Sequence, residues 1–141
     1  MELKRVVVTG LGAVTPLGLN VDETWEALLN GVSGAGPITH FDASQFKTQF
    51  ACEVKNFDPT LYLDKKEVRK FDRYAQFAVA AAKEAVGDSA LDLEKVDKNR
   101  VGVIFAAGIG GIRTFEEEVG GYFTNIERGP KFNPFFIPKM I

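Results

Sequence analysis

The stretch VVVTGLGAVTPLG, residues 6–18, places three consecutive valines before a turn that contains three glycines. A run of β-branched residues favours a strand buried on both faces, as in the centre of a parallel sheet. We therefore predict a strand over residues 3–9 that ends in a glycine-containing turn. Such a turn either holds a nucleotide phosphate or only carries a buried strand around a corner.

The dinucleotide-binding fingerprint requires G-x-G-x-x-G after a strand and at the start of a helix. Gly10 and Gly12 match its first two glycines, but Thr15 stands at the third position and Pro16 follows it. The next predicted helix begins only near Asp22, so a phosphate would not meet a helix N-terminus. The pattern favours a tight turn that leaves a buried strand, and a nucleotide-dependent enzyme is the alternative.

The rest of the chain alternates between helical and strand patterns. Helices are predicted over residues 22–30, 64–86 and 112–123, with Asn20 and Asp64 as N-caps and Gly31 ending the first. Asp72 can cap a fresh helix, so residues 64–86 form either one helix or a short helix followed by a long one. Further strands are predicted over residues 50–54 and 100–107, and an irregular stretch from Arg128 onward. This alternation indicates an α/β layered fold with partly parallel strands.

Composition narrows the class of protein. The 141 residues suit one domain, and 45% hydrophobic residues with 26% charged residues are ordinary for a soluble globular protein. A net charge of −2 argues against a dedicated nucleic-acid binder. No apolar run reaches the roughly 20 residues that span a membrane, and no signal peptide is visible, so we expect a soluble protein. The single cysteine suits a reducing compartment, so we expect this protein in the cytoplasm. Three phenylalanines among residues 128–141 have no later element to bury them, so we expect a chain cut within a larger fold.

The one cysteine and the one histidine exclude a disulfide and a structural zinc site, and we expect no metal. Cys52 and His40 could in principle form a nucleophile and base. However, Cys52 lies within a predicted strand with no helix N-terminus to lower its pKa, so we interpret it as a small buried hydrophobe. His40 is interpreted as a turn residue bonded locally. The sequence GVSGA, residues 31–35, lacks the last glycine of a nucleophile elbow and is interpreted as a flexible turn.

A run of cations is the most distinctive feature of the sequence. Within nine residues it holds Lys65, Lys66, Arg69, Lys70 and Arg73. On one continuous helix the last four would form a single stripe, opposite an apolar line through Val68 and Phe71. A solvated helix face and a docking patch both remain open. Because the chain is acidic overall, a small acidic protein suits such a patch better than a nucleic acid does.

The ordered motifs resemble a known family. They are RVVVTGLGAVTPLG, TWEALLNGVSG, HFD, KKEVRKFDRYAQFAVAAAKEA, GVIFAAGIGG and NPFFIPKMI. In this order they are similar to the N-terminal part of the elongating β-ketoacyl-[acyl-carrier-protein] synthases of fatty-acid biosynthesis, nearest to the synthase II type, along the whole chain. The resemblance implies a thiolase-like layered α/β/α fold in a homodimer. Residues 1–141 would be its first half only, incomplete and truncated before the nucleophile elbow.

The family's activity is a decarboxylative Claisen condensation of an acyl thioester with malonyl-carrier protein. It uses a nucleophilic cysteine and two histidines, and its substrates carry phosphopantetheine on the acyl carrier protein, so the resemblance implies no cofactor. Cys52 and His40 match none of the catalytic residues, so the resemblance implies that this chain alone is inactive and holds no catalytic residue. The alternative is a non-catalytic thiolase-fold partner resembling a chain-length factor, or a truncated product.

Several site residues carry over by resemblance. Lys66, Arg69 and Lys70 match the basic docking site for the carrier protein, which Lys65 extends. Ile109 and Phe136 match residues of the acyl pocket, the latter near the dimer interface, with core packing as the alternative for both. Arg128 and Lys131 lie near a second basic region whose spacing departs from the family's.

Overall fold

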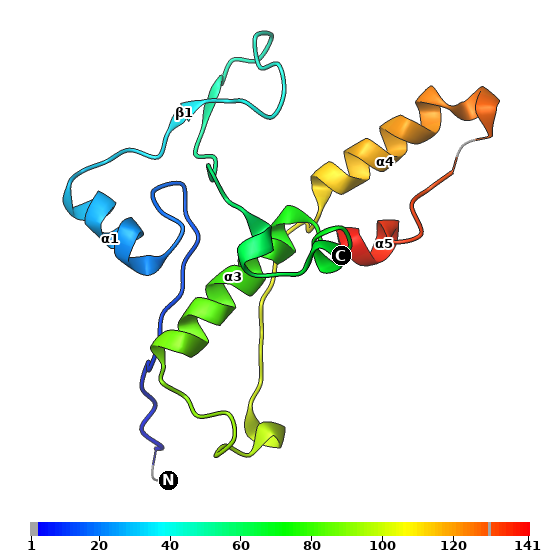
Figure 1. Ribbon diagram of the computed structural model, residues 1–141. Helices are drawn as coiled ribbons and strands as arrows, with labels where there is room; N and C mark the ends of the chain where they lie inside the picture. The colour runs from blue at the N-terminus through cyan, green and yellow to red at the C-terminus, as the bar shows by residue number, and fades with distance from the viewer. Residues whose placement is uncertain (1–2, 130) are drawn as a thin grey trace. The chain divides into compact units, whose positions relative to one another are not determined.

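The computed structural model describes residues 3–129 and 131–141. The α-helices there are α1 Val21–Leu29, α2 Lys65–Val68, α3 Arg73–Asp88, α4 Ile112–Thr124 and α5 Phe136–Met140. Single 3-10 turns form η1 Pro59–Leu61, η2 Lys98–Arg100 and η3 Ile126–Arg128, and the strands are β1 Gly36–Pro37 and β2 Phe50–Ala51 (Figure 1). The chain forms two compact units. The first joins the chain up to Asp58 with Ala80–Glu94, and the second joins Pro59–Val79 with Lys95–Ile141.

In the first unit, α1 begins and ends where the sequence predicts. The side chain of Asn20 accepts a hydrogen bond from the Glu23 amide at 2.8 Å, which satisfies a donor that the first turn leaves open. At the other end Gly31 adopts a φ of +65°, and its amide donates to the Leu28 carbonyl at 3.1 Å. The Val32 amide donates to the Ala27 carbonyl at 2.9 Å, which completes a Schellman motif.

The glycines of the opening stretch lie against the C-terminal half of α3, within the first unit. A Cβ atom on Gly10 would collide with the Ala85 carbonyl oxygen, and one on Gly12 with the Ala81 carbonyl oxygen. The backbone between them is bound to the same helix. The Leu11 amide donates to Asp88 Oδ2 at 2.8 Å, and the Ala13 amide to Glu84 Oε2 at 2.8 Å. These glycines therefore permit close packing of the chain on α3.

The second unit holds the cationic segment, which forms two helices. Asp64 caps α2, as predicted, by accepting from the amides of Lys66 and Glu67 at 2.7 and 2.9 Å. Asp72 Oδ1 accepts from the Tyr74 amide at 3.2 Å at the start of α3. The prediction of a short helix followed by a long one is confirmed, and a single continuous helix is wrong. The Gln76 side chain donates to the carbonyls of Val68 and Phe71, which the break leaves without helical partners.

Helix α4 matches its predicted range, but the irregular stretch predicted after Arg128 contains α5. The Asn133 side chain accepts from the Phe135 amide at 2.9 Å just before this helix. Pro138 is the third residue of α5, where its missing N–H would have had no partner within the helix. The proline is therefore compatible with the helix, and the prediction of irregular structure is wrong over Phe136–Met140.

The predicted strands over residues 3–9 and 100–107 are wrong as hydrogen-bonded strands. Neither segment contains strand structure. Arg100 belongs to η2, and Figure 1 draws the other residues of both segments as thin traces without arrows. The predicted strand over residues 50–54 is reduced to β2, which pairs antiparallel with β1. A strand exists only where a neighbouring strand completes its ladder. Val6 is 89% exposed and Ile104 is 97% exposed, so neither apolar segment is covered within its unit.

Two absences hold for residues 3–129 and 131–141 alone. No helix among them is long and apolar enough to cross a membrane. They also contain no group of three or more His, Cys, Asp or Glu side chains arranged to hold a metal ion.

Candidate functional site

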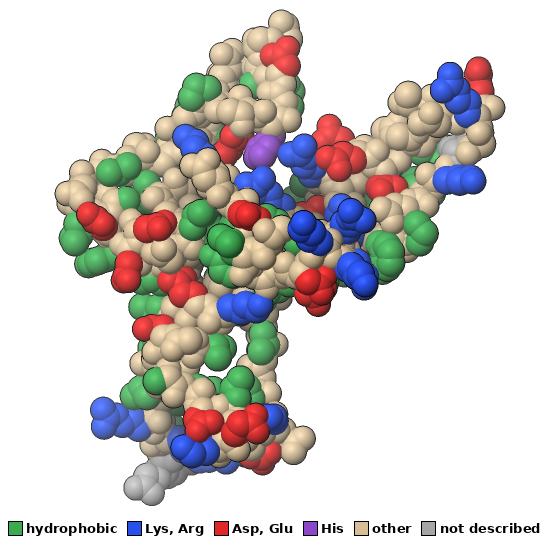
Figure 2. All heavy atoms as spheres, viewed as in Figure 1, with side chains coloured by type: hydrophobic (Ala, Val, Ile, Leu, Met, Phe, Trp, Pro, Cys, Tyr) green, Lys and Arg blue, Asp and Glu red, His purple; other side chains and the backbone are tan. Residues whose placement is uncertain are grey.

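The predicted docking cations lie on α2 and around the break that follows it. Lys65 and Lys66 are in α2, Arg69 is its C-cap, Lys70 follows, and Arg73 opens α3. All five side chains are exposed. In Figure 2, Lys and Arg side chains gather on the second unit beside the C-terminus. Because the helix is interrupted, the predicted single stripe along a continuous helix is wrong, but the cations still occupy one exposed segment, which we call the α2–α3 basic surface.

Local chemistry holds this surface in place. Cations at the start of a helix oppose its macrodipole, and the Asp64 carboxylate at the N-cap offsets them. The ammonium of Lys70 lies 5.9 Å from the centre of the Phe135 ring, and the guanidinium of Arg73 lies 5.2 Å from that of Phe77. Aromatic faces attract cations at such distances. These contacts orient the charged groups of the two side chains, and both residues remain exposed to solvent.

Ile109 lies in a hollow of about 320 Å³ in the second unit. Its lining consists mainly of apolar side chains and glycine backbone, contributed by Tyr74, Phe105, Ala107, Gly108, Ile109, Gly110, Met140 and Ile141. The Ile109 side chain is 75% exposed. A surface of this composition suits an aliphatic chain, because it offers no charged side chain to be desolvated.

Phe136 lies in an aromatic cluster and is not among the residues that line this hollow. Its ring stacks on Phe132 at a centroid distance of 5.4 Å and lies 6.2 Å from Phe115. Phe132 in turn stacks on Tyr122 at 5.0 Å. The contacts of Phe136 in this structure are those of aromatic packing, and Ile109 is exposed; the acyl-pocket role of both residues stays a prediction.

The second basic region has acidic neighbours. Arg128 in η3 and Lys131 line a hollow of about 340 Å³ together with Glu117 and Glu118. Glu118 Oε2 also accepts a hydrogen bond from the Asn133 amide at 2.9 Å. Mixed charge of this kind attracts an acidic partner less strongly than the α2–α3 basic surface does.

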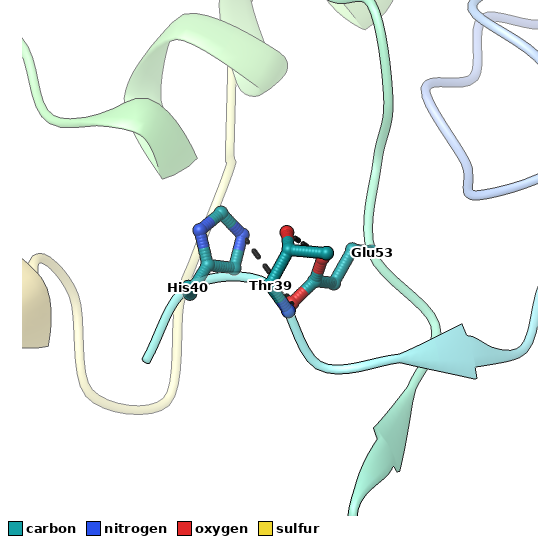
Figure 3. A network of polar contacts seen from close by, with 3 residues as sticks. All are labelled: Thr39, His40 and Glu53. Carbon is teal, nitrogen blue, oxygen red and sulfur yellow. Dashed lines mark hydrogen bonds and ion pairs between the residues drawn. The ribbon is translucent and has the colours of Figure 1, made fainter. Parts of the chain in front are cut away.

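His40 and Cys52 take up different surroundings from those predicted. His40 Nε2 lies 3.9 Å from Glu53 Oε1, and Glu53 also accepts from the Thr39 hydroxyl and amide at 2.6 and 2.9 Å (Figure 3). These bonds, that of the hydroxyl above all, lower the pKa of Glu53. Cys52 is exposed, so its interpretation as a buried hydrophobe is wrong. The edge of so short a strand pair leaves it uncovered.

The opening turn does not provide a nucleotide cradle. A phosphate-binding loop needs backbone amides that point into open space. Here the amides of Leu11 and Ala13 are already bound to the carboxylates of Asp88 and Glu84, and α3 fills the space beside both glycines. Two anionic side chains at this position would also repel a phosphate.

Sequence reasoning missed one polar contact in the second unit. Asp72 Oδ2 accepts a hydrogen bond from the hydroxyl of Thr114, which is 3% exposed, so it links the starts of α3 and α4. Arg113 Nε donates to Glu117 Oε1 at 2.8 Å along α4, which raises the pKa of Arg113. The sequence indicates only that Asp72 can cap a helix. Its contact with Thr114 could not be predicted, because that residue lies 42 positions further along the chain.

The chain belongs to the β-ketoacyl synthase family, whose N-terminal domain matches residues 3–138. It is 50% identical over 141 residues to 3-oxoacyl-[acyl-carrier-protein] synthase 2 of Coxiella burnetii. The aligned region covers all of this chain and 34% of that protein. The chain thus spans about a third of the length of the curated relatives it matches.

Two solved structures agree with this assignment. An ishigamide ketosynthase/chain length factor superposes with a TM-score of 0.72 at 28% identity, over 96% of this chain and 33% of that one. A type II PKS ketosynthase in complex with its acyl-carrier protein superposes with a TM-score of 0.73 at 27% identity, over 99% of this chain and 35% of that one. The predicted fold class, the thiolase-like fold of ketosynthases, is confirmed.

Proposed function

We propose that this chain is the N-terminal part of a 3-oxoacyl-[acyl-carrier-protein] synthase that elongates fatty acids. The observation that carries the proposal is 50% identity to such a synthase along the entire chain. The family relationship and the ketosynthase fold of the two solved structures support it.

The complete enzyme would carry out a decarboxylative Claisen condensation. An acyl group moves from the phosphopantetheine thiol of the carrier protein to a cysteine. The thioester to the carrier protein breaks, and a thioester to the cysteine forms. Malonyl-carrier protein then loses CO₂, and the resulting carbanion attacks the acyl thioester. The cysteine thiolate leaves, and 3-oxoacyl-carrier protein is released. An activated thiolate and donors to the developing oxyanion are needed. We place these groups outside residues 1–141, so we expect this chain alone to be inactive.

The chain's own contribution would be recognition. The acidic carrier protein would dock on the α2–α3 basic surface through Lys65, Lys66, Arg69 and Lys70, which are all exposed. Ile109 would form part of the acyl-pocket wall, a role that its apolar hollow supports. Phe136 would reach the acyl pocket near the contact between two copies in a homodimer. We place the enzyme in the cytoplasm and propose no resident cofactor, because phosphopantetheine arrives on the carrier protein.

Charge reversal tests the docking surface. In the complete protein, replacing Lys66→Glu and Arg69→Glu should weaken acyl-carrier-protein affinity by about tenfold or more at low ionic strength. The loss should shrink as salt screens the charges, with a Debye length of about 10 Å at 0.1 M. Calorimetric titration at two salt concentrations measures both effects. Lys4→Glu with Lys47→Glu gives the same change in net charge outside this surface and should leave the affinity unchanged; equal losses in both variants would reject the docking surface.

A non-catalytic partner is the second candidate, because one of the superposed structures is a ketosynthase/chain length factor. The residue at the nucleophile elbow of the complete protein separates the two functions. A cysteine there, with two histidines later in the chain, supports the synthase. A glutamine supports a decarboxylating or chain-length-setting partner.

A further inference from the structure

The turn over residues 108–111 carries Ile109 between the extended segment before it and α4. With 75% of its side chain exposed, Ile109 is not held in place by the packing of its own side chain. Its position therefore depends on what fixes the backbone of the turn. Within the turn and the first turn of α4, the Ile112 amide donates to the Gly110 carbonyl and the Phe115 amide to the Gly111 carbonyl, both at 3.0 Å. Two further contacts come from elements distant in the sequence.

The first anchor is the backbone of α5. The Gly111 amide donates to the Met140 carbonyl at 2.7 Å. Gly110 has a φ of +76°, and a Cβ atom on it would collide with the same carbonyl oxygen. A residue with a side chain would be both strained and obstructed here, so Gly110 allows the turn to reach Met140.

The second anchor is Asp72. Its Oδ2 atom accepts the hydroxyl hydrogen bond of Thr114, and a Cβ atom on Gly111 would lie 2.8 Å from that same oxygen. The other carboxylate oxygen accepts from the Tyr74 amide at 3.2 Å. One carboxylate is thus fixed by α3 on one side and packed against the first residues of α4 on the other. A half-buried carboxylate with two donors has little freedom to move.

Asp72 also has a distinctive place in the sequence. It lies between Lys70 and Arg73 of the α2–α3 basic surface, and Tyr74 two residues later lines the same hollow as Ile109. The Asp72 carboxylate therefore lies against the turn over residues 108–111, and Asp72 itself lies within the segment that forms the α2–α3 basic surface.

We propose that Asp72 is a positioning residue that sets the place of Ile109, and thereby the acyl chain length that the pocket accepts. This inference rests on the proposed function. Loss of the Asp72–Thr114 contact leaves Met140 as the only distant anchor of the turn named above, so Ile109 is held less firmly at its place in the lining of the hollow. The basic side chains stay exposed, so carrier-protein affinity is retained.

The test compares Asp72→Ala and Thr114→Val with Thr114→Ser in the complete enzyme. The ratio of kcat/KM for a long and a short acyl-carrier protein should change by about fivefold or more in the first two variants, since a methylene in an apolar pocket discriminates by tenfold or more. Thr114→Ser keeps the hydroxyl and should keep the wild-type ratio. Asp97→Ala removes another capping carboxylate, which accepts from the Asn99 amide at the start of η2, and should also keep it.

Amide hydrogen exchange of residues 108–111 gives a second readout, with faster exchange expected in Asp72→Ala and Thr114→Val. Variants that melt at lower temperature but keep the wild-type selectivity ratio would overturn the inference and leave Asp72 a purely structural residue. If Asp72→Ala does not fold, an equal ratio in Thr114→Val and Thr114→Ser overturns it. A wild-type enzyme that does not condense would reject the proposed function, and unchanged exchange at residues 108–111 would separately reject the positioning role.

Discussion

Ala90 adopts a φ of +52° just beyond the end of α3, a backbone conformation in which a side chain is disfavoured. Its amide donates to the Gly87 carbonyl at 3.3 Å, and the Ser89 side chain accepts from the Leu91 amide at 3.2 Å. These bonds hold the residue in the left-handed region that glycine occupies at most helix ends. The sequence therefore places alanine where the local geometry favours glycine.

Replacing Ala90→Gly in the complete protein should stabilise the end of α3 by about 1 kcal/mol, because relief of the left-handed strain exceeds the extra entropy that glycine loses. Amide exchange at the last turn of α3 measures the change. Ala90→Val, with a β-branched side chain, should act in the opposite direction. Slower exchange in the valine variant than in the glycine variant would show that this strain is absent.

The helices show which predictions local chemistry can carry. The sequence predicts Asn20 and Asp64 as helix starts and Asp72 as an alternative start, because a capping side chain bonds to amides only two or three residues away. The Schellman end of α1 at Gly31 is equally local. In contrast, the hydrogen bond between Asp72 and Thr114 joins residues that are distant in the sequence. The lack of strand structure over residues 101–107 also depends on distant residues, because a strand needs a neighbouring strand. The run of cations over residues 65–73 predicts which residues form the α2–α3 basic surface, but it does not decide whether the helix breaks between α2 and α3.

The packing of the opening stretch on α3 predicts a large effect of a small substitution. In Gly12→Ala the added Cβ would lie 2.7 Å from the Ala85 amide nitrogen and collide with the Ala81 carbonyl, so the chain must move away from α3. We expect a loss of about 2 kcal/mol or more in unfolding free energy. Denaturant unfolding of the complete protein measures it.

The matched control for this substitution lies on the same helix. Gly87 is in α3, and a Cβ on it would meet nothing within 4 Å. Gly87→Ala should therefore stabilise the protein by about 0.5–1 kcal/mol through helix propensity alone. If both substitutions change stability by similar small amounts, the close approach of Gly12 to α3 is not present in solution.

For the molecule as a whole, the confirmed ketosynthase fold explains why two apolar segments are exposed in this chain. Residues 3–9 and 101–107 have the composition of buried strands but no paired neighbours, and Val103 is 81% exposed. The relatives are about three times as long as this chain, and a layered fold supplies strand partners from its other elements. We therefore expect both segments to form paired strands in the complete protein.

Hydrogen exchange distinguishes this assignment from a real absence of strands. Amides of residues 3–9 and 101–107 should exchange slowly in the complete protein and rapidly in the 141-residue polypeptide, which should also aggregate through its uncovered apolar faces. Rapid exchange at these amides in both proteins would show that the two segments are not strands.

Reconstitution of the condensation tests the central claim most directly. The complete protein is incubated with acyl-carrier protein and malonyl-carrier protein, and the carrier-bound products are identified by mass spectrometry. We predict release of CO₂ and formation of a 3-oxoacyl-carrier protein that is two carbons longer than the starting acyl group. Recovery of both substrates unchanged, or decarboxylation of malonyl-carrier protein to the acetyl form with no condensation product, would contradict the account.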